Sequence, residues 1–405
     1  MLKDRKNRKD RINNRRKIII FLLVSALILS FVIVTDIFTQ RYRNNRSAVF
    51  RTEGGKFQIY RDKKWEDFTV KGVHIDFGEE ANSAVFPGFG SGYTKKEYRR
   101  WFKLIADMNA NVILVQRVLP PEFYQAFYEF NALAKKPLFL LQGIWVNDNN
   151  KPLSDVYDNN LILNISEEIR NTIDTIHGKA SFKKKIAPYV IGFILGIETD
   201  NDFITDANQQ NTKVMGFEGD YLFTENASPY EAWLAALGNY TIFYEQEKYG
   251  GPQRLVGWLN RSLKSPDEMS AVDLEHIFVT EKCGAGIFAS YAFFPFRPDA
   301  GRPEYGDLIA KLGSSHTMPV IAAEFGVLSS RDRNRAIGIS SGVFSEKEQG
   351  DLLAGLFDSI MNAGFSGGIV YTWYDGAGIE PGYGLMVWEQ LKASYTILKD
   401  KFTEY

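Results

Sequence analysis

The chain has 405 residues, with 48 basic and 49 acidic side chains and a formal net charge of −1. Hydrophobic residues make up 45% of it and aromatic residues 14%. This composition excludes a disordered or fibrous protein and one that coats nucleic acid, since such chains lack apolar residues or carry a strong net charge. The single cysteine, Cys283, excludes an intramolecular disulfide and a cysteine-based zinc cluster. Four histidines without metal-ligand spacing complete this picture, so no metal and no other cofactor is expected.

The charge is unevenly distributed. Residues 1–17 hold nine Lys or Arg against two Asp, a local +7, which leaves 39 basic and 47 acidic residues, or −8, for the remainder. Residues 18–38 are apolar except for two serines, Thr35 and Asp36, and about 20 residues of helix suffice to cross roughly 30 Å of hydrocarbon. We therefore expect one transmembrane helix at 18–38 that contacts the lipid bilayer.

Three interpretations of this segment compete. A cleaved signal peptide would end in small residues, which are missing here, and a buried core helix would have a polar face. An uncleaved anchor is favoured, and the basic tail places the N-terminus in the cytoplasm. The rest of the chain is then expected on the outer side of the cell membrane, as a single-pass protein.

After the anchor, residues 39–55 are rich in Arg, Asn and Gly and are predicted to form a stem, followed by one domain over 56–405. The apolar stretches 57–60 and 65–73 flank the polar residues 61–64, which predicts a short β-hairpin. From there onward, short apolar runs alternate with helical stretches. Eight runs are predicted strands: 70–76, 111–117, 137–146, 189–198, 254–260, 285–294, 318–325 and 367–373.

Helix start signals stand between these strands. Thr94, Ser228 and Ser345 each precede a Glu by three residues, which is the pattern of a capping box, and Pro120 opens a helix through Leu133. Alternation of buried strands and helices indicates a parallel sheet covered on both faces. Eight repeats in about 340 residues favour a (β/α)8 TIM barrel over an open sheet. No phosphate-binding glycine motif occurs, so nucleotide binding has no support.

Two glutamates follow apolar strand runs. Glu198 ends the fourth predicted strand and Glu324 lies near the end of the seventh. The carboxyl ends of barrel strands carry the reactive groups of such folds. A pair of carboxylates there suits glycoside hydrolysis, in which one protonates the leaving oxygen and the other acts as nucleophile or base.

Six stretches in this order resemble the clan of retaining (β/α)8 glycoside hydrolases that includes the family 5 cellulases and the family 2 galactosidases. The resemblance covers about residues 57–395. The stretches are 71–75, 101–111, 191–198, 287–295, 323–326 and 367–373.

This resemblance implies roles for particular residues. Glu324 would be the nucleophile, Glu198 the acid/base, Tyr291 a hydrogen-bond donor to the nucleophile, and Trp373 a platform for the sugar. The implied activity is a glycosidase that acts on β-linked oligo- or polysaccharide. Further candidates for substrate binding near strand ends are Trp145, Trp258, Arg117 and His74.

Two positions depart from the clan. Ile197 stands before Glu198 where the clan usually has Asn, and Leu114 stands where it usually has Arg on the second strand. In the clan that Asn contacts the sugar 2-hydroxyl, and such a contact can supply several kcal/mol. A second hypothesis therefore stays open, in which the barrel is a polysaccharide-binding subunit of an exopolysaccharide synthesis or export machinery.

Two smaller expectations concern the loops. Residues 200–224 have few helix signals and are too long for a standard βα connection, so they are expected to form a cleft wall or lid over the sugar site, or a disordered insertion. Asp375 is expected either to touch sugar hydroxyls or to be a solvated loop acid. The sugar, the linkage and the oligomeric state are not predictable from the sequence.

Overall fold

The computed structural model describes residues 49–75, 93–146, 155–179, 183–197, 201–260, 272–296, 305–332, 342–375, 381–387 and 389–405. Only the unit of residues 48–405 is considered below. Within the described ranges no helix is long and apolar enough to cross a membrane. The predicted tail at 1–17 and anchor at 18–38 lie outside these ranges.

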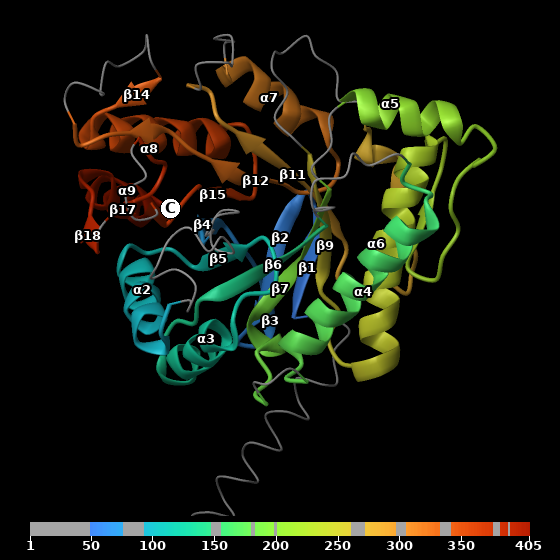
Figure 1. The fold of residues 1–405 in the computed structure, drawn as a ribbon, viewed down its shortest axis with the longest axis horizontal. Coiled ribbons are helices and arrows are strands. Elements are labelled where there is room, and N and C mark those ends of the chain that lie inside the picture. The colour runs from blue at the N-terminus through green and yellow to red at the C-terminus, as the bar shows by residue number, and fades with distance from the viewer. Residues whose placement is uncertain are drawn as a thin grey trace, which may run out of the picture. The chain divides into compact units, whose positions relative to one another are not determined.

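Eight parallel strands close into a barrel (Figure 1). Around the barrel each strand is hydrogen-bonded to the next, and the eighth returns to the first. All eight predicted strands are confirmed as members of this barrel, which is the predicted (β/α)8 fold. In order around the barrel they are β4 (Val70–His74), β5 (Val112–Val115), β6 (Phe139–Val146), β7 (Val190–Ile197), β9 (Leu255–Asn260), β11 (Ile287–Phe293), β12 (Val320–Phe325) and β15 (Gly367–Val370).

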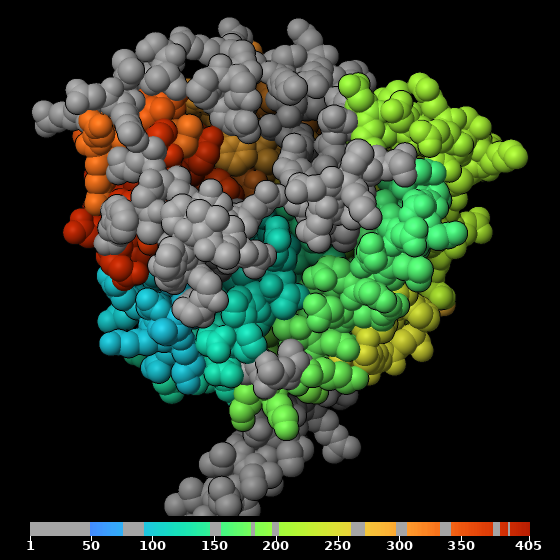
Figure 2. Space-filling model, viewed as in Figure 1, coloured from blue at the N-terminus to red at the C-terminus, as the bar shows by residue number. Residues whose placement is uncertain are grey.

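Helices surround the strands, and Figure 2 shows α2 and α3 in cyan to teal and α4 and α6 in green to yellow on one face of the molecule. The capping boxes at Thr94, Ser228 and Ser345 are confirmed, with each side chain and its Glu partner exchanging hydrogen bonds. The described helices are α2 (Lys95–Asp107), α3 (Pro121–Leu133), α4 (Asn159–Ile176), α5 (Asn201–Gln210), α6 (Pro229–Tyr249), α7 (Tyr305–Ser315), α8 (Glu346–Asn362) and α9 (Ala393–Glu404).

The connection between β9 and β11 differs from the other units. Its described residues contain a 3-10 turn (Leu274–His276) and β10 (Ile277–Val279) in place of an α-helix. Strand β10 pairs antiparallel with β8 (Leu222–Thr224), which belongs to the previous connection. The alternative of a disordered insertion at 200–224 is wrong, because α5 and β8 lie within it and Leu222 is fully buried, while the predicted role as a wall or lid stays a prediction.

A three-stranded meander covers the end of the barrel where its strands begin. It comprises β1 (Phe50–Glu53), β2 (Lys56–Arg61) and β3 (Lys64–Asp67), so the predicted hairpin gains a third strand from the predicted stem. Phe57 packs edge-on against Phe288 inside the barrel, with ring centroids 5.1 Å apart. Burial of Phe50, from the predicted stem, and of Phe57 stabilises the meander against the barrel.

Small sheets extend the other end of the barrel. Strand β13 (Leu328–Ser329) pairs with β14 (Val343–Phe344), and β16 (Tyr374–Asp375), β17 (Met386–Val387) and β18 (Gln390–Leu391) form a second sheet. These short strands follow β12 and β15, so they hold the loops at the barrel mouth.

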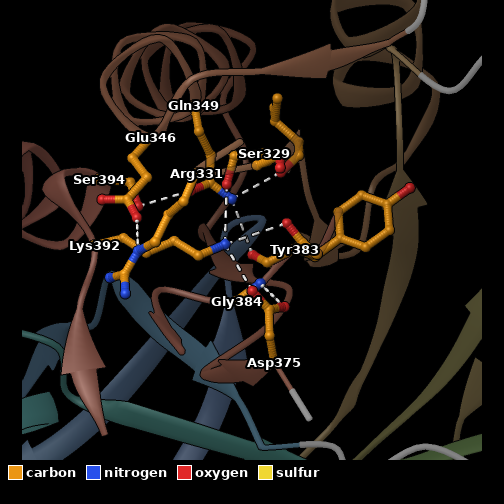
Figure 3. Close-up of polar contacts among 12 residues, drawn as sticks. Ser329, Arg331, Glu346, Gln349, Asp375, Tyr383, Gly384, Lys392 and Ser394 are labelled. Carbon is orange, nitrogen blue, oxygen red and sulfur yellow. Dashed lines mark hydrogen bonds and ion pairs between the residues drawn. The ribbon is translucent and has the colours of Figure 1, made fainter. Parts of the chain in front are cut away.

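A buried ion pair joins these loops to α8 and α9 (Figure 3). The Nζ atom of Lys392 lies 2.6 Å from Oδ2 of Asp375, and both side chains are almost fully buried. Lys392 also donates to Oγ of Ser329 at 2.9 Å, while the Gly384 amide donates to Asp375 at 2.6 Å. Asp375 is therefore neither a solvated acid nor open to a sugar, because it serves as the counter-ion of Lys392.

We expect Lys392→Met to lower the free energy of unfolding by about 3–5 kcal/mol, because it leaves the Asp375 carboxylate buried without its cation. The double variant Lys392→Met with Asp375→Leu should lose less than the sum of the single changes. Urea unfolding measures all three. The matched control is Lys347→Met, at an exposed pair with Asp351 on α8. If Lys392→Met lowers the free energy of unfolding no more than this control does, the buried ion pair does not stabilise the fold.

Candidate active site

Three polar side chains meet where the barrel strands end. His74 is the last residue of β4, Gln116 follows β5, and Glu324 is the penultimate residue of β12. The register of β12 shifts on both sides near Glu324, against β11 and against β15. Such bulges re-aim a side chain, and here they accompany a carboxylate at the mouth of the barrel.

The Glu324 carboxylate has two close neighbours, and both approach the same oxygen. Nδ1 of His74 lies 3.2 Å from Oε1, within ion-pair distance but off the direction of a hydrogen bond. Nε2 of Gln116 donates a hydrogen bond to Oε1 at 3.2 Å. Glu324 is 6% exposed and His74 is fully buried. Oε2 receives no such contact from the described residues and is therefore available to a ligand.

Nε2 of His74 is also notable, because among the described residues it finds no hydrogen-bond partner. Buried polar atoms in folded proteins are usually paired. The imidazole rests against the ring of Tyr371, with centroids 5.2 Å apart. His74, predicted from the sequence as a candidate binding group, thus lies beside the predicted nucleophile.

Glu198 directly follows β7 and lies outside the described residues. Its role as acid/base and its separation from Glu324 therefore stay predictions.

Trp145 lies on the face of β6 that points into the barrel, in alternation with Phe139 and Leu141 of the interior core. It is half-buried, and its Nε1 has no hydrogen-bond partner among the described residues. The ring lies against Gly196 of β7, where an added Cβ would approach Nε1 to 2.9 Å. Its place near the mouth suits the predicted role in substrate binding.

Arg117 is exposed beside Gln116. The charge of Arg117 acts on Glu168 of α4. Burial raises the pKa of the Glu168 carboxyl, and the positive charge of Arg117 partly offsets this rise. This relation places Arg117 toward the helix layer, and its contact with a substrate stays a prediction.

Three predicted aromatic residues face the helices instead of the mouth. Trp258 is buried and donates its indole N–H to the Leu234 carbonyl of α6 at 3.1 Å. Trp373 is fully buried and packs against Tyr395 of α9. Burial excludes both as sugar platforms in this structure.

Tyr291 also belongs to the core between the barrel and the helices. Its hydroxyl lies 2.7 Å from Nε2 of His316, whose Nδ1 lies 3.1 Å from Glu275. Burial raises the pKa of Tyr291 above its usual range. The predicted hydrogen bond from Tyr291 to Glu324 is therefore replaced by this contact with His316.

Four residues at this end of the barrel were not predicted from the sequence: Gln116 contacts Glu324, Tyr371 contacts His74, and Phe294 and Tyr383 contact Tyr371. Gln116 stands just beyond an apolar strand, and a polar residue at that position is a usable signal at the carboxyl end of a barrel strand. Phe294 and Tyr371 lie inside the stretches that carry the family resemblance, yet nothing in their spacing separates them from core residues. Tyr383 lies in a loop without a pattern of its own.

No protein-family model and no curated protein matches this sequence. Among solved structures, a GH2 β-galacturonidase from Eisenbergiella tayi, determined with galacturonate, superposes with a TM-score of 0.57 at 14% identity, over 88% of this chain and 54% of that one. A β-glucuronidase from Ruminococcus gnavus superposes with a TM-score of 0.55 at 14% identity, over 87% and 53%.

The chain thus spans about half the length of these enzymes, and at such identity the likeness concerns the fold. The family 5 part of the resemblance stays a prediction. With its closed barrel of eight parallel strands, the chain has the TIM-barrel fold of GH2 glycoside hydrolases.

Proposed function

We propose that this chain is a retaining β-glycoside hydrolase, or a transglycosylase, in which Glu324 is the nucleophile and Glu198 the acid/base. The observation that supports the proposal most is the Glu324 carboxylate itself. It is almost buried at the mouth of the barrel, its Oε1 is held by His74 and Gln116, and its Oε2 is left for the substrate. Active sites of such barrels lie at this end.

The proposed reaction has two displacements. Oε2 of Glu324 attacks the anomeric carbon while Glu198 gives its proton to the departing glycosidic oxygen, which leaves a covalent glycosyl-enzyme. Glu198 then takes a proton from water, or from the hydroxyl of an acceptor sugar, and the oxygen so activated displaces Glu324. The anomeric configuration is retained because it is inverted twice. This mechanism needs the two carboxyl groups about 5–5.5 Å apart.

We further propose that His74 and Gln116 together take the place of the arginine that is usual on the second strand of the clan. Leu114, at that position, is buried among interior residues of the barrel and offers no donor. Gln116 lies two residues further along and reaches Glu324. The pair keeps one carboxylate oxygen bound and fixes the orientation of the other.

The substrate class and the location are argued from the solved neighbours and from the N-terminal sequence. The solved neighbours are named as β-glycosidases, which favours a β-linked sugar for this chain. The basic tail and the apolar stretch 18–38 favour a protein anchored in the cell membrane with its barrel on the outer side. We propose cell-surface or exported polysaccharide as the substrate and a polysaccharide synthesis or export machinery as the partner.

One observation favours a second candidate function. Ile197 stands where the clan usually has the Asn that contacts the sugar 2-hydroxyl, and Leu114 stands where it usually has Arg. A barrel without them suits a polysaccharide-binding subunit that has lost catalysis. Covalent trapping separates the two functions, because a binding subunit forms no glycosyl-enzyme.

The first test is labelling with a panel of aryl 2-deoxy-2-fluoro-β-glycosides, followed by intact mass and peptide mapping. We expect one sugar per chain, attached to Glu324. The fluorine slows hydrolysis of the glycosyl-enzyme so much that this intermediate accumulates. Glu324→Gln should take no label. Adding azide to Glu324→Ala should form the α-glycosyl azide, which identifies the missing nucleophile.

The proposal fails if no member of the panel labels the protein, or if the label is on another residue. A β-glycosyl azide from Glu324→Ala would also overturn it, since that product assigns Glu324 as the acid/base.

His74→Phe gives a second prediction. It removes the polar neighbour of Glu324, whose Nδ1 lies 3.2 Å from Oε1, while filling the buried site. Leaving a buried polar group without a compensating neighbour costs about 1–3 kcal/mol. Labelling at saturation should therefore slow by roughly 10- to 100-fold. His276→Gln is the matched control, because His276 is partly exposed and pairs with Glu231 of α6. Equal labelling rates for both variants would show that His74 does not support the nucleophile.

A further inference from the structure

Three half-buried aromatic side chains stand together beside Glu324. The rings of Phe294, Tyr371 and Tyr383 contact one another pairwise, with centroids 5.5, 5.3 and 5.6 Å apart and each pair near edge-to-face. They come from the ends of β11 and β15 and from the loop before β17. We call this cluster the aromatic wall.

The aromatic wall is built onto the candidate site by direct contacts. Tyr371 rests on His74, which approaches Glu324, and its backbone N–H donates to the Phe325 carbonyl at 2.9 Å. Phe294 follows directly on β11, where Ala292 is in register with Glu324. The aromatic wall is therefore joined to the Glu324 carboxylate through His74 and through the pairing of β11 with β12.

Gly326, two residues after Glu324, shows how tightly the wall is packed. A Cβ added there would approach the Tyr371 carbonyl oxygen to 2.8 Å and ring atoms of Phe294 and Tyr383 to 2.9 Å each. A larger residue than glycine would collide with the wall at this position, so the rings pack directly against the backbone of residue 326.

Tyr383 is fixed by the polar network around Lys392. Gln349 donates to the Tyr383 carbonyl at 3.2 Å, and the neighbouring Gly382 exchanges two backbone hydrogen bonds of 3.0 Å with Ser329. The Gly384 amide is held by Asp375. Figure 3 shows the Tyr383 ring pointing away from this network. A ring held in this way binds a ligand without losing much conformational freedom.

We propose that the aromatic wall is the platform for the sugar bound at Glu324, with Tyr383 as its outer member. This inference rests on the proposed function and assigns a pyranoside to the site. Tyrosine offers a large apolar face to the C–H side of a sugar ring and a hydroxyl to its polar edge. The wall thereby fills the role that the family resemblance implies for Trp373, whose ring is buried.

The test uses the fluoro-glycoside labelling described above. Its dependence on reagent concentration gives two quantities: the inactivation constant, which is the concentration at half-maximal rate, and the labelling rate at saturation. We expect Tyr383→Ala and Tyr383→Leu to raise the inactivation constant by about tenfold, while the rate at saturation stays within about threefold, since Glu324 and His74 are untouched. Tyr383→Phe keeps the face of the ring and should stay within about threefold on both. Phe278→Ala, at an exposed aromatic residue of β10, should change neither.

An unchanged inactivation constant in Tyr383→Leu overturns the wall and leaves the proposed function intact. If the wild type takes no label, the proposed function fails, and the wall is then tested by calorimetric titration of Glu324→Gln with β-linked tetrasaccharides of glucose, galactose, mannose and N-acetylglucosamine. Binding that weakens about tenfold in Glu324→Gln with Tyr383→Leu supports the wall. No binding by any of the four overturns it.

Discussion

Burial of one carboxylate is the constraint on which the mouth of this barrel depends. Removing a charged group from water is costly unless it is paired, so the fold must bring partners to Glu324. These come from β4, which β15 separates from β12 in the barrel, and from the end of β5, one strand further on. Closure of the sheet therefore does more than bury apolar surface. It also fixes the distances between groups that are far apart in sequence.

The loops beyond the strands meet a second electrostatic requirement. Lys392 and Asp375 are both nearly buried and satisfy each other, and their hydrogen bonds reach Ser329 and Gly384. Buried pairs of this kind contribute specificity as much as stability. Here the pair sets the path of the loop that carries Tyr383. The candidate site thus combines a carboxylate held by strands with an aromatic wall whose Tyr383 loop is held by the network around Lys392 and Asp375.

The sequence allowed the architecture to be predicted because runs of apolar residues and capping boxes are local signals. All eight strands and the caps at Thr94, Ser228 and Ser345 follow from them. The face of a strand on which a residue lies is harder to predict, since both faces of a parallel barrel strand are buried and apolar. Trp258 and Tyr291 were therefore expected at the mouth but lie against the helices. Tyr383 depends on contacts with α8 and α9, which no local pattern encodes.

The filled interior of the barrel limits how a ligand moves. Phe288 occupies the space above Gly257, where an added Cβ would approach its ring to 2.4 Å, and Phe57 packs against it from the meander. The described interior is thus a solid plug and not a conduit between the two ends. A molecule bound at Glu324 therefore has no route through the described interior to the end of the barrel that the meander covers.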